Sequence, residues 1–360
     1  MHARDEGRHR PLPSARGIAI NHLSFFFFFR KVNKTARDIF LSKSIRDFIH
    51  CRKQCEKHMK RLPALSLILL ALLLIPSFQN LSTVHGETED ENYFIRSTVT
   101  YANPSGNTNV WNFSEDDRTI SLFMNNTWQT VELVNSTFPM ETKKDEDGNS
   151  VAVLQFPNLT LIPGKNVNFT VWYHIVSKPR TISDISENES GNLTNIPSNI
   201  VDEYTREEGP WQTSNQALQA LALSLKGSET KVLTIIKNFI VWIKEYIKYP
   251  SPQSRHENPY YPNQTYVLRK GDCDDQAMLL ITLCRIVKIP SYLQVGSIYL
   301  PDHFDNASFW DGRVSLVERR IGWHGWAVVY VPPWGWLPVD LTYVRENSAD
   351  PLSCLLYTSP

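Results

Sequence analysis

Cys273, His324 and Asp340 are residue types that together can break or transfer an acyl bond through a covalent intermediate. A cysteine thiolate is a strong nucleophile, a histidine can remove the thiol proton, and a carboxylate can orient the imidazole and stabilise its charged form. The three residues occur along the chain in the order nucleophile, base and orienter. This pattern predicts a thiol-dependent enzyme with a catalytic Cys-His-Asp triad.

Cys273 stands at the predicted start of an apolar helix. Asp272 is a suitable N-cap, and Asp275 occupies the third helical position, as in a capping box. The helix macrodipole favours a thiolate in the first turn by roughly 0.3–2 kcal/mol. The neighbouring aspartates, Asp274 included, oppose this effect. We therefore expect Cys273 to require a cationic partner, and His324 can provide one.

A predicted hairpin brings the other two residues together. Residues 324–331 and 336–342 read as strands joined by a turn at Pro332–Gly335, which leaves His324 and Asp340 a few positions from being opposite. Adjacent strands lie about 4.8 Å apart, so the carboxylate can reach the imidazole. Taken singly, each residue has an ordinary structural explanation. Cys284 is interpreted as a buried core residue. The tryptophans at 323, 326, 334 and 336 are more typical of a core than of a cleft, with the alternative that one of them lines the substrate groove.

The elements that must position these residues follow from apolar periodicity and turn residues. Helices are predicted at Ser214–Leu225, at Glu229–Lys248 and from Cys273 onward, with a tyrosine- and proline-rich loop at 258–266. Tyr292–Leu300 reads as a strand and 303–320 as an irregular excursion. Upstream, short β-rich segments predict a small β-sandwich over residues 92–176, followed by a polar linker at 177–212. The predicted strands there are 94–101, 130–134, 151–156 and 167–176.

Charge divides the chain into two regions. Residues 1–86 hold 15 Lys and Arg against 5 Asp and Glu, whereas the rest holds 22 against 32. Met59-Lys60-Arg61, an apolar run from Leu62 to Phe78 and Val84-His85-Gly86 form the pattern of a secretory signal peptide at 59–86. We expect translation to begin at Met59, residues 1–58 to be a non-native or unstructured extension, and residues 353–360 to be an artefactual tail.

An exported, acidic protein fits the remaining composition. Ten Asn-X-Ser/Thr sequons follow Met59, which predicts a secreted or cell-surface glycoprotein. Cys273 and Cys284 are too far apart on one helix to form a disulfide. The spacing of His50, Cys51, Cys55 and His58 fits no zinc pattern, so we expect no metal and no cofactor. The acidic folded region argues against a nucleic-acid partner, and membrane contact is expected only through an uncleaved signal or a missing C-terminal anchor.

The same residues resemble a known family. Gly271-Asp272-Cys273-Asp274-Asp275, with the apolar helix after it, looks like the cysteine block of the transglutaminase-like superfamily. His324-Gly325-Trp326-Ala327-Val328 and Val339-Asp340-Leu341-Thr342 look like its histidine and aspartate blocks. The acidic form around Cys273 is most similar to exported prokaryotic, particularly archaeal, members. Asp274 stands where a basic residue often follows the cysteine, which separates the chain from animal cross-linking enzymes.

The resemblance implies an α+β fold with a papain-like core over residues 213–345, in which the nucleophile helix packs on an antiparallel sheet. It also implies an acyl-thioester step. We expect peptidase-like amide hydrolysis of a protein or peptide substrate, with cell-surface glycoproteins among the expected substrates. Two alternatives stay open: acyl transfer to a lysine amine, which would cross-link proteins, and a non-catalytic cell-surface binding module.

Overall fold

The computed structural model describes residues 29–30, 90–145, 147–178, 185–251, 259–309, 312–342 and 352. The predicted signal peptide, the C-terminal segment 353–360 and all of the predicted extension except Phe29 and Arg30 lie outside these residues. Within the described part of the chain, no helix is both long enough and apolar enough to cross a membrane.

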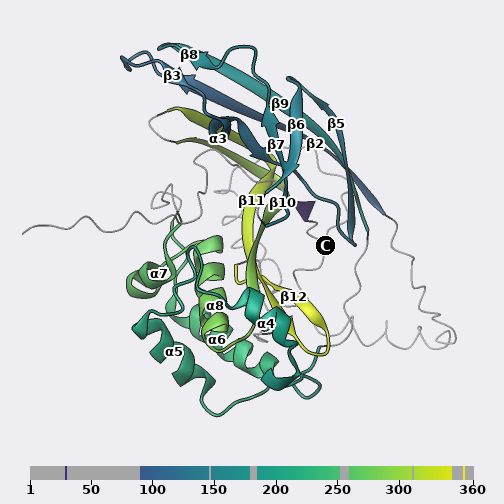
Figure 1. The fold of residues 1–360 in the computed structure, drawn as a ribbon, viewed down its shortest axis with the longest axis vertical. Helices are drawn as coiled ribbons and strands as arrows, with labels where there is room; N and C mark the ends of the chain where they lie inside the picture. The colour runs from purple at the N-terminus through teal and green to yellow at the C-terminus, as the bar shows by residue number, and fades with distance from the viewer. Residues whose placement is uncertain are drawn as a thin grey trace, which may run out of the picture. The chain divides into compact units, whose positions relative to one another are not determined.

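The fold is α+β with antiparallel pairing throughout its main sheets, as predicted (Figure 1). One seven-stranded sheet has the order β1-β10-β11-β2-β9-β5, and β12 also pairs with β11. The one parallel contact in it is made by the two-residue β1 with β10. The strands of this sheet are β1 (Phe29–Arg30), β2 (Glu91–Asn103), β5 (Gln129–Ser136), β9 (Lys165–Ser177), β10 (Ser291–Phe309), β11 (Val314–Val331) and β12 (Gly335–Val339).

The strands before residue 178 build two smaller sheets and a core of their own. The three-stranded sheet consists of β4 (Thr119–Ser121), β6 (Met140–Lys144) and β7 (Ser150–Leu154), and the two-stranded one of β3 (Trp111–Asn112) and β8 (Thr160–Leu161), with the short α3 (Glu115–Arg118) between β3 and β4. Alternating residues of β2 and β9 pack with Phe113, Leu154 and Phe156 in one cluster. All four predicted strands are present.

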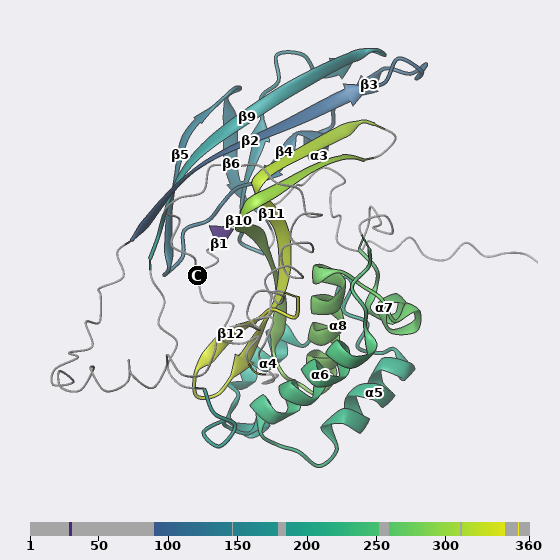
Figure 2. The same ribbon diagram turned by 180° about the vertical axis from the view of Figure 1, so that it is seen from behind.

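A separate β-sandwich is not established by this arrangement. Tyr101 and Thr100 of β2 pair with Val314 and Ser315 of β11, so the upstream strands and the C-terminal strands share one sheet. The reason is the length of β10 and β11, which pair with each other from Ser291 to Phe309 (Figure 2). The prediction of an irregular excursion at 303–320 is therefore wrong in its described part.

The helical part begins earlier than predicted. It consists of the 3₁₀ turn η1 (Leu193–Asn195), α4 (Ser198–Tyr204), α5 (Gln216–Lys226), α6 (Val232–Tyr246), α7 (Pro262–Leu268) and α8 (Cys273–Ile286). Residues 177–212 are not simply a linker, because Ile196 and Trp211 belong to the core formed with α6 and α8. Ile196 and Trp211 are widely spaced among polar residues, so no apolar periodicity in the sequence indicates that they are buried. The predicted loop at 258–266 contains the start of α7, where Pro262 is well suited to the first helical position.

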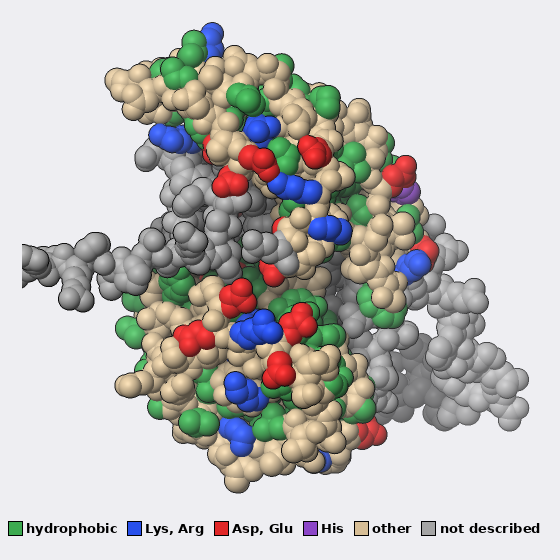
Figure 3. Space-filling model, in the orientation of Figure 1, with side chains coloured by type: hydrophobic (Ala, Val, Ile, Leu, Met, Phe, Trp, Pro, Cys, Tyr) green, Lys and Arg blue, Asp and Glu red, His purple; other side chains and the backbone are tan. Residues whose placement is uncertain are grey.

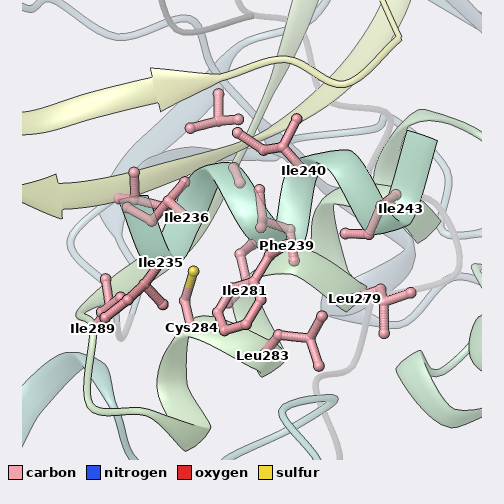
Figure 4. Packing of buried hydrophobic residues seen from close by; sticks show 14 of the residues in the cluster. Ile235, Ile236, Phe239, Ile240, Ile243, Leu279, Ile281, Leu283, Cys284 and Ile289 are labelled. Carbon is pink, nitrogen blue, oxygen red and sulfur yellow. The ribbon is translucent and has the colours of Figure 1, made fainter. Parts of the chain in front are cut away.

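Helix α6 buries one face against α8. Ile236, Phe239, Ile240 and Ile243 recur at helical spacing and are fully buried, whereas Val241 points outward and is 41% exposed. Figure 4 shows Phe239 of α6 facing Ile281 and Leu283 of α8, and Ile240 on the side of α6 that faces the strands. Every residue of α8 from Cys273 to Arg285 is buried, which makes it the central helix, as predicted.

Two neighbouring residues of α6 provide a matched stability test. Ile240→Ala should lower the free energy of unfolding by about 2–5 kcal/mol, because it removes a fully buried side chain and leaves a cavity. Val241→Ala replaces another β-branched residue in the same helix and should change it by less than about 0.5 kcal/mol. Urea denaturation followed by circular dichroism measures both. Equal losses would show that α6 does not pack as described.

Candidate active site

The start of α8 is held by backbone contacts to a buried carboxylate. Asp275 is fully buried, and its carboxylate accepts hydrogen bonds from the backbone N–H of Asp272 at 3.0 Å and of Tyr260 at 2.7 Å. The first is the bond expected of the third residue in a capping box. Gly271 allows this close approach, since a Cβ there would lie 2.6 Å from the Asp275 Cβ. The tie to Tyr260 was not predicted, because nothing local in the sequence marks it.

Cys273 is the first residue of α8, and its thiol is shielded from water. The residue is 7% exposed, and burial raises the pKa of the thiol well above its usual range, with Asp274 and Asp272 adding to the effect. A hydrogen bond from the backbone N–H of Gly325 acts in the opposite direction. The expectation that a helix N-terminus alone cannot ionise this thiol agrees with these directions.

Asp274 and Asp272 form an acidic pair beside the thiol. Burial and a hydrogen bond with Asp272 hold the pKa of Asp274 well above its usual range. The charges of Asp272 and Asp275 act on the pKa of Asp274 in the same direction, because like charges at close range disfavour each other.

His324 and Asp340 lie side by side on neighbouring strands. Gly335, whose φ of 82° suits glycine, turns the chain so that β12 runs back along β11 and Ala327 pairs with Val339. His324 Nε2 then lies 2.8 Å from Asp340 Oδ2, and each residue is 1% exposed. The predicted pairing of these two residues is present. The imidazole also stacks on the Trp326 ring.

The second oxygen of Asp340 is held as well. Asp340 Oδ1 accepts hydrogen bonds from the Thr342 backbone N–H at 3.1 Å and from the Thr342 hydroxyl at 3.2 Å. The carboxylate is thus fixed in rotation, with one oxygen directed at the imidazole. Sequence reasoning gave Thr342 no role, although the motif Asp340-Leu341-Thr342 was a signal for this short side chain-to-backbone turn.

The helix and the hairpin meet at Gly325, the residue after His324. Its N–H reaches the Cys273 thiol, and a Cβ at Gly325 would lie 3.0 Å from the Asp274 Cβ. Asp340 is near enough for its charge to raise the pKa of Cys273. The three predicted residues therefore converge on one region, where α8 starts against β11.

Two side-chain groups among the described residues have the spacing of metal ligands. Asp272, Cys273 and Asp274 offer ligand atoms within 4.8 Å of one another, and so do His303, Asp305 and Glu318. The first group coincides with the candidate nucleophile. The second lies on the β10–β11 hairpin, away from the predicted site residues in sequence. Neither was predicted.

A central helix that carries a cysteine, packed on an antiparallel sheet that carries a histidine and an aspartate, is the arrangement of papain-like cysteine enzymes. Residues 219–341 match the family model of the transglutaminase-like superfamily, so this part of the chain is similar to members of that superfamily.

Solved structures with a similar course of the chain come from bacteria. A candidate cysteine protease from Cytophaga hutchinsonii is 18% identical, with a TM-score of 0.45 over 71% of this chain and 78% of that one. The periplasmic domain of TgpA from Pseudomonas aeruginosa, bound to ethylmercury, is 15% identical, with a TM-score of 0.37 over 70% of this chain and 73% of that one. No curated protein matches the chain.

The raised pKa of Cys273 predicts how the thiol responds to alkylation. In a His324→Ala variant the thiol loses its neighbouring base, so the rate of its reaction with iodoacetamide should rise about tenfold per pH unit and should still be rising at alkaline pH. The native protein should react readily near neutral pH. Labelling is read by mass spectrometry on the peptide that contains residue 273, because the chain also holds Cys51, Cys55 and Cys354. Cys273→Ala is the control for that peptide, and Cys284 should take up no label because it is fully buried. Equal labelling of His324→Ala and native protein at pH 7 would contradict ionisation by the imidazole.

Proposed function

We propose that this chain is an exported thiol-dependent amidase of the peptidase type, with Cys273 as nucleophile, His324 as general base and acid, and Asp340 as orienting carboxylate. The observation that carries the proposal is the buried 2.8 Å contact between His324 and Asp340 directly beside the residue that touches the Cys273 thiol. A module that only binds a ligand needs no such alignment.

The tautomer of His324 follows from its contact with Asp340. If Nε2–H donates to the carboxylate, Nδ1 is the nitrogen with the lone pair that can accept the thiol proton. Proton transfer yields a thiolate and an imidazolium, which the Asp340 carboxylate stabilises without itself taking the proton. The cost of creating a thiolate next to acidic groups is offset because the imidazolium forms at the same moment.

The reaction then runs in two halves. The thiolate attacks the amide carbonyl, the C–N bond breaks, and the imidazolium gives its proton to the leaving amine, which leaves an acyl-thioester on Cys273. In the second half His324 removes a proton from water, the hydroxide attacks the thioester, and the acid leaves as the thiol is reprotonated. The backbone N–H of Cys273 is the donor we assign to the oxyanion, a contact typically worth 10²–10³ in rate.

An extracytoplasmic location accords with the described surface. Eight of the nine described sequon asparagines are exposed, and Asn263 is half-buried. The asparagines are Asn112, Asn125, Asn135, Asn158, Asn168, Asn188, Asn192, Asn263 and Asn306. Acidic and basic side chains are interspersed on the face that Figure 3 shows, without the basic stripe typical of nucleic-acid binding. We therefore propose protein or peptide substrates at the cell surface.

The two described cysteines separate catalysis from packing. Cys273→Ala should abolish turnover, with a loss on the order of 10⁶, while the protein stays folded. Cys284→Ala should leave kcat within about twofold and cost about 1 kcal/mol of stability, because the Cys284 sulfur lies in the apolar core (Figure 4). Amide hydrolysis in a peptide library and thermal unfolding measure the two effects. Turnover that survives in Cys273→Ala would overturn the proposal.

The acyl acceptor decides between hydrolysis and cross-linking. We expect incubation with cell-surface proteins in H₂¹⁸O to release new amino groups and to place one ¹⁸O in each new carboxyl group, as mass spectrometry can show. A labelled primary alkylamine in the same mixture should not be incorporated. Amine incorporation or lysine isopeptides in place of ¹⁸O-labelled carboxyls would instead establish acyl transfer through the same thioester.

A further inference from the structure

His303, Asp305 and Glu318 bring one imidazole and two carboxylates together on the β10–β11 hairpin. One ligand atom from each lies within 4.8 Å of the other two, and His303 Nε2 is 3.4 Å from Glu318 Oε2. Asp305 and Glu318 are direct partners in the strand pairing, so their side chains share one face of the sheet. His303 is two residues before Asp305, which is the spacing of side chains on the same face.

The group places two carboxylates close together, one of them beside the imidazole of His303. Like charges on directly opposed strand residues repel each other, and here one of the two carboxylates is Glu318, only 8% exposed. The backbone N–H of Trp323 at 2.9 Å satisfies Glu318 Oε1, which leaves Oε2 directed toward His303. Asp305 Oδ1 accepts from the backbone N–H of Asn306. A bound cation would be attracted by both carboxylates.

The local backbone departs from a regular ladder at this place. Tyr299 pairs with Ile321 and Phe304 with Arg319, so residues 300–303 of β10 lie opposite the single residue Arg320 of β11. Arg320 adopts a φ of 61°, which is uncommon for a residue with a side chain. Bulges of this kind re-aim side chains and accompany functional sites. Here the bulge brings His303 to the carboxylate of Glu318.

We infer that His303, Asp305 and Glu318 form a binding site for a divalent transition-metal ion of the Zn²⁺ type. Three protein ligands of the His and Asp/Glu kind, with remaining positions for water, fit tetrahedral Zn²⁺. Calcium takes six to eight oxygen ligands, so a neutral imidazole argues against it. The sequence did not predict this site, because its three ligands lie on two strands and their spacing along the chain matches no known metal-binding motif.

The site has a structural connection to the candidate active site. Glu318 accepts the N–H of Trp323, the residue directly before His324. An ion that holds Glu318 against β10 would therefore stabilise the bulge next to the strand segment that carries the imidazole. The inference does not depend on the proposed function, because binding can be measured without any substrate.

Isothermal titration of the full chain with ZnCl₂ at pH 7 tests the site. A Cys273→Ala background removes the thiol from the other described group of possible ligands, Asp272, Cys273 and Asp274. In that background we expect one Zn²⁺ bound with micromolar or tighter affinity and a higher unfolding temperature with the ion present. His303→Ala and Glu318→Gln should each weaken binding at least about tenfold. Glutamine at 318 keeps an oxygen for the Trp323 N–H, so the fold is retained.

Asp302→Asn is the matched control, since Asp302 is an exposed acid in the same bulge that does not belong to the group. It should bind Zn²⁺ as the parent does. Absence of Zn²⁺ binding in the Cys273→Ala protein would overturn the inference. Unchanged affinity in both ligand variants would overturn it as well, and so would Ca²⁺ binding as tight as that of Zn²⁺.

Discussion

The hydrogen bond between His324 and Asp340 constrains the fold around it, because both groups lie almost entirely out of water. Removing a carboxylate from water costs several kcal/mol unless its oxygens find partners. Asp340 meets this requirement with the imidazole on one oxygen and Thr342 on the other. Both contacts depend on the register of β11 and β12. A shift by one residue would turn His324 to the opposite face of the sheet.

The surroundings of the Cys273 thiol disfavour its charged form, whereas those of the Asp340 carboxylate stabilise its charge. Cys273 sits where burial and acidic neighbours disfavour its charged form, so the resting state suited to this environment is a neutral thiol. In the mechanism proposed above, a proton moves from the Cys273 sulfur to a His324 nitrogen, so the net charge of the buried region does not change.

The sequence predicted those features that depend on interactions between residues close together along the chain. The spacing of apolar residues in α6, the buried character of α8 and the pairing of His324 with Asp340 could all be predicted from the sequence. Contacts between distant segments could not. Neither the Tyr260–Asp275 bond nor the Gly325 contact with Cys273 leaves a local signal. The bulge at 300–303 interrupts the alternation of β10, which is why the continuous strand was read as an excursion.

Contacts at the C-terminal end of α8 hold this helix, and with it the proposed nucleophile Cys273, in place. Arg285 is buried near the end of this helix, and its guanidinium donates to the backbone oxygens of Ser291 and Arg206 while stacking on Trp211. Burial lowers its pKa to about 10, so the residue stays charged at neutral pH. These contacts tie α8 to the start of β10 and to the segment before α5. With Asp275 fixing the first turn, the helix is held at both ends, and Cys273 cannot drift from β11 without breaking buried polar contacts. Such support from surrounding residues is what a site needs to hold reacting groups to within a fraction of an ångström.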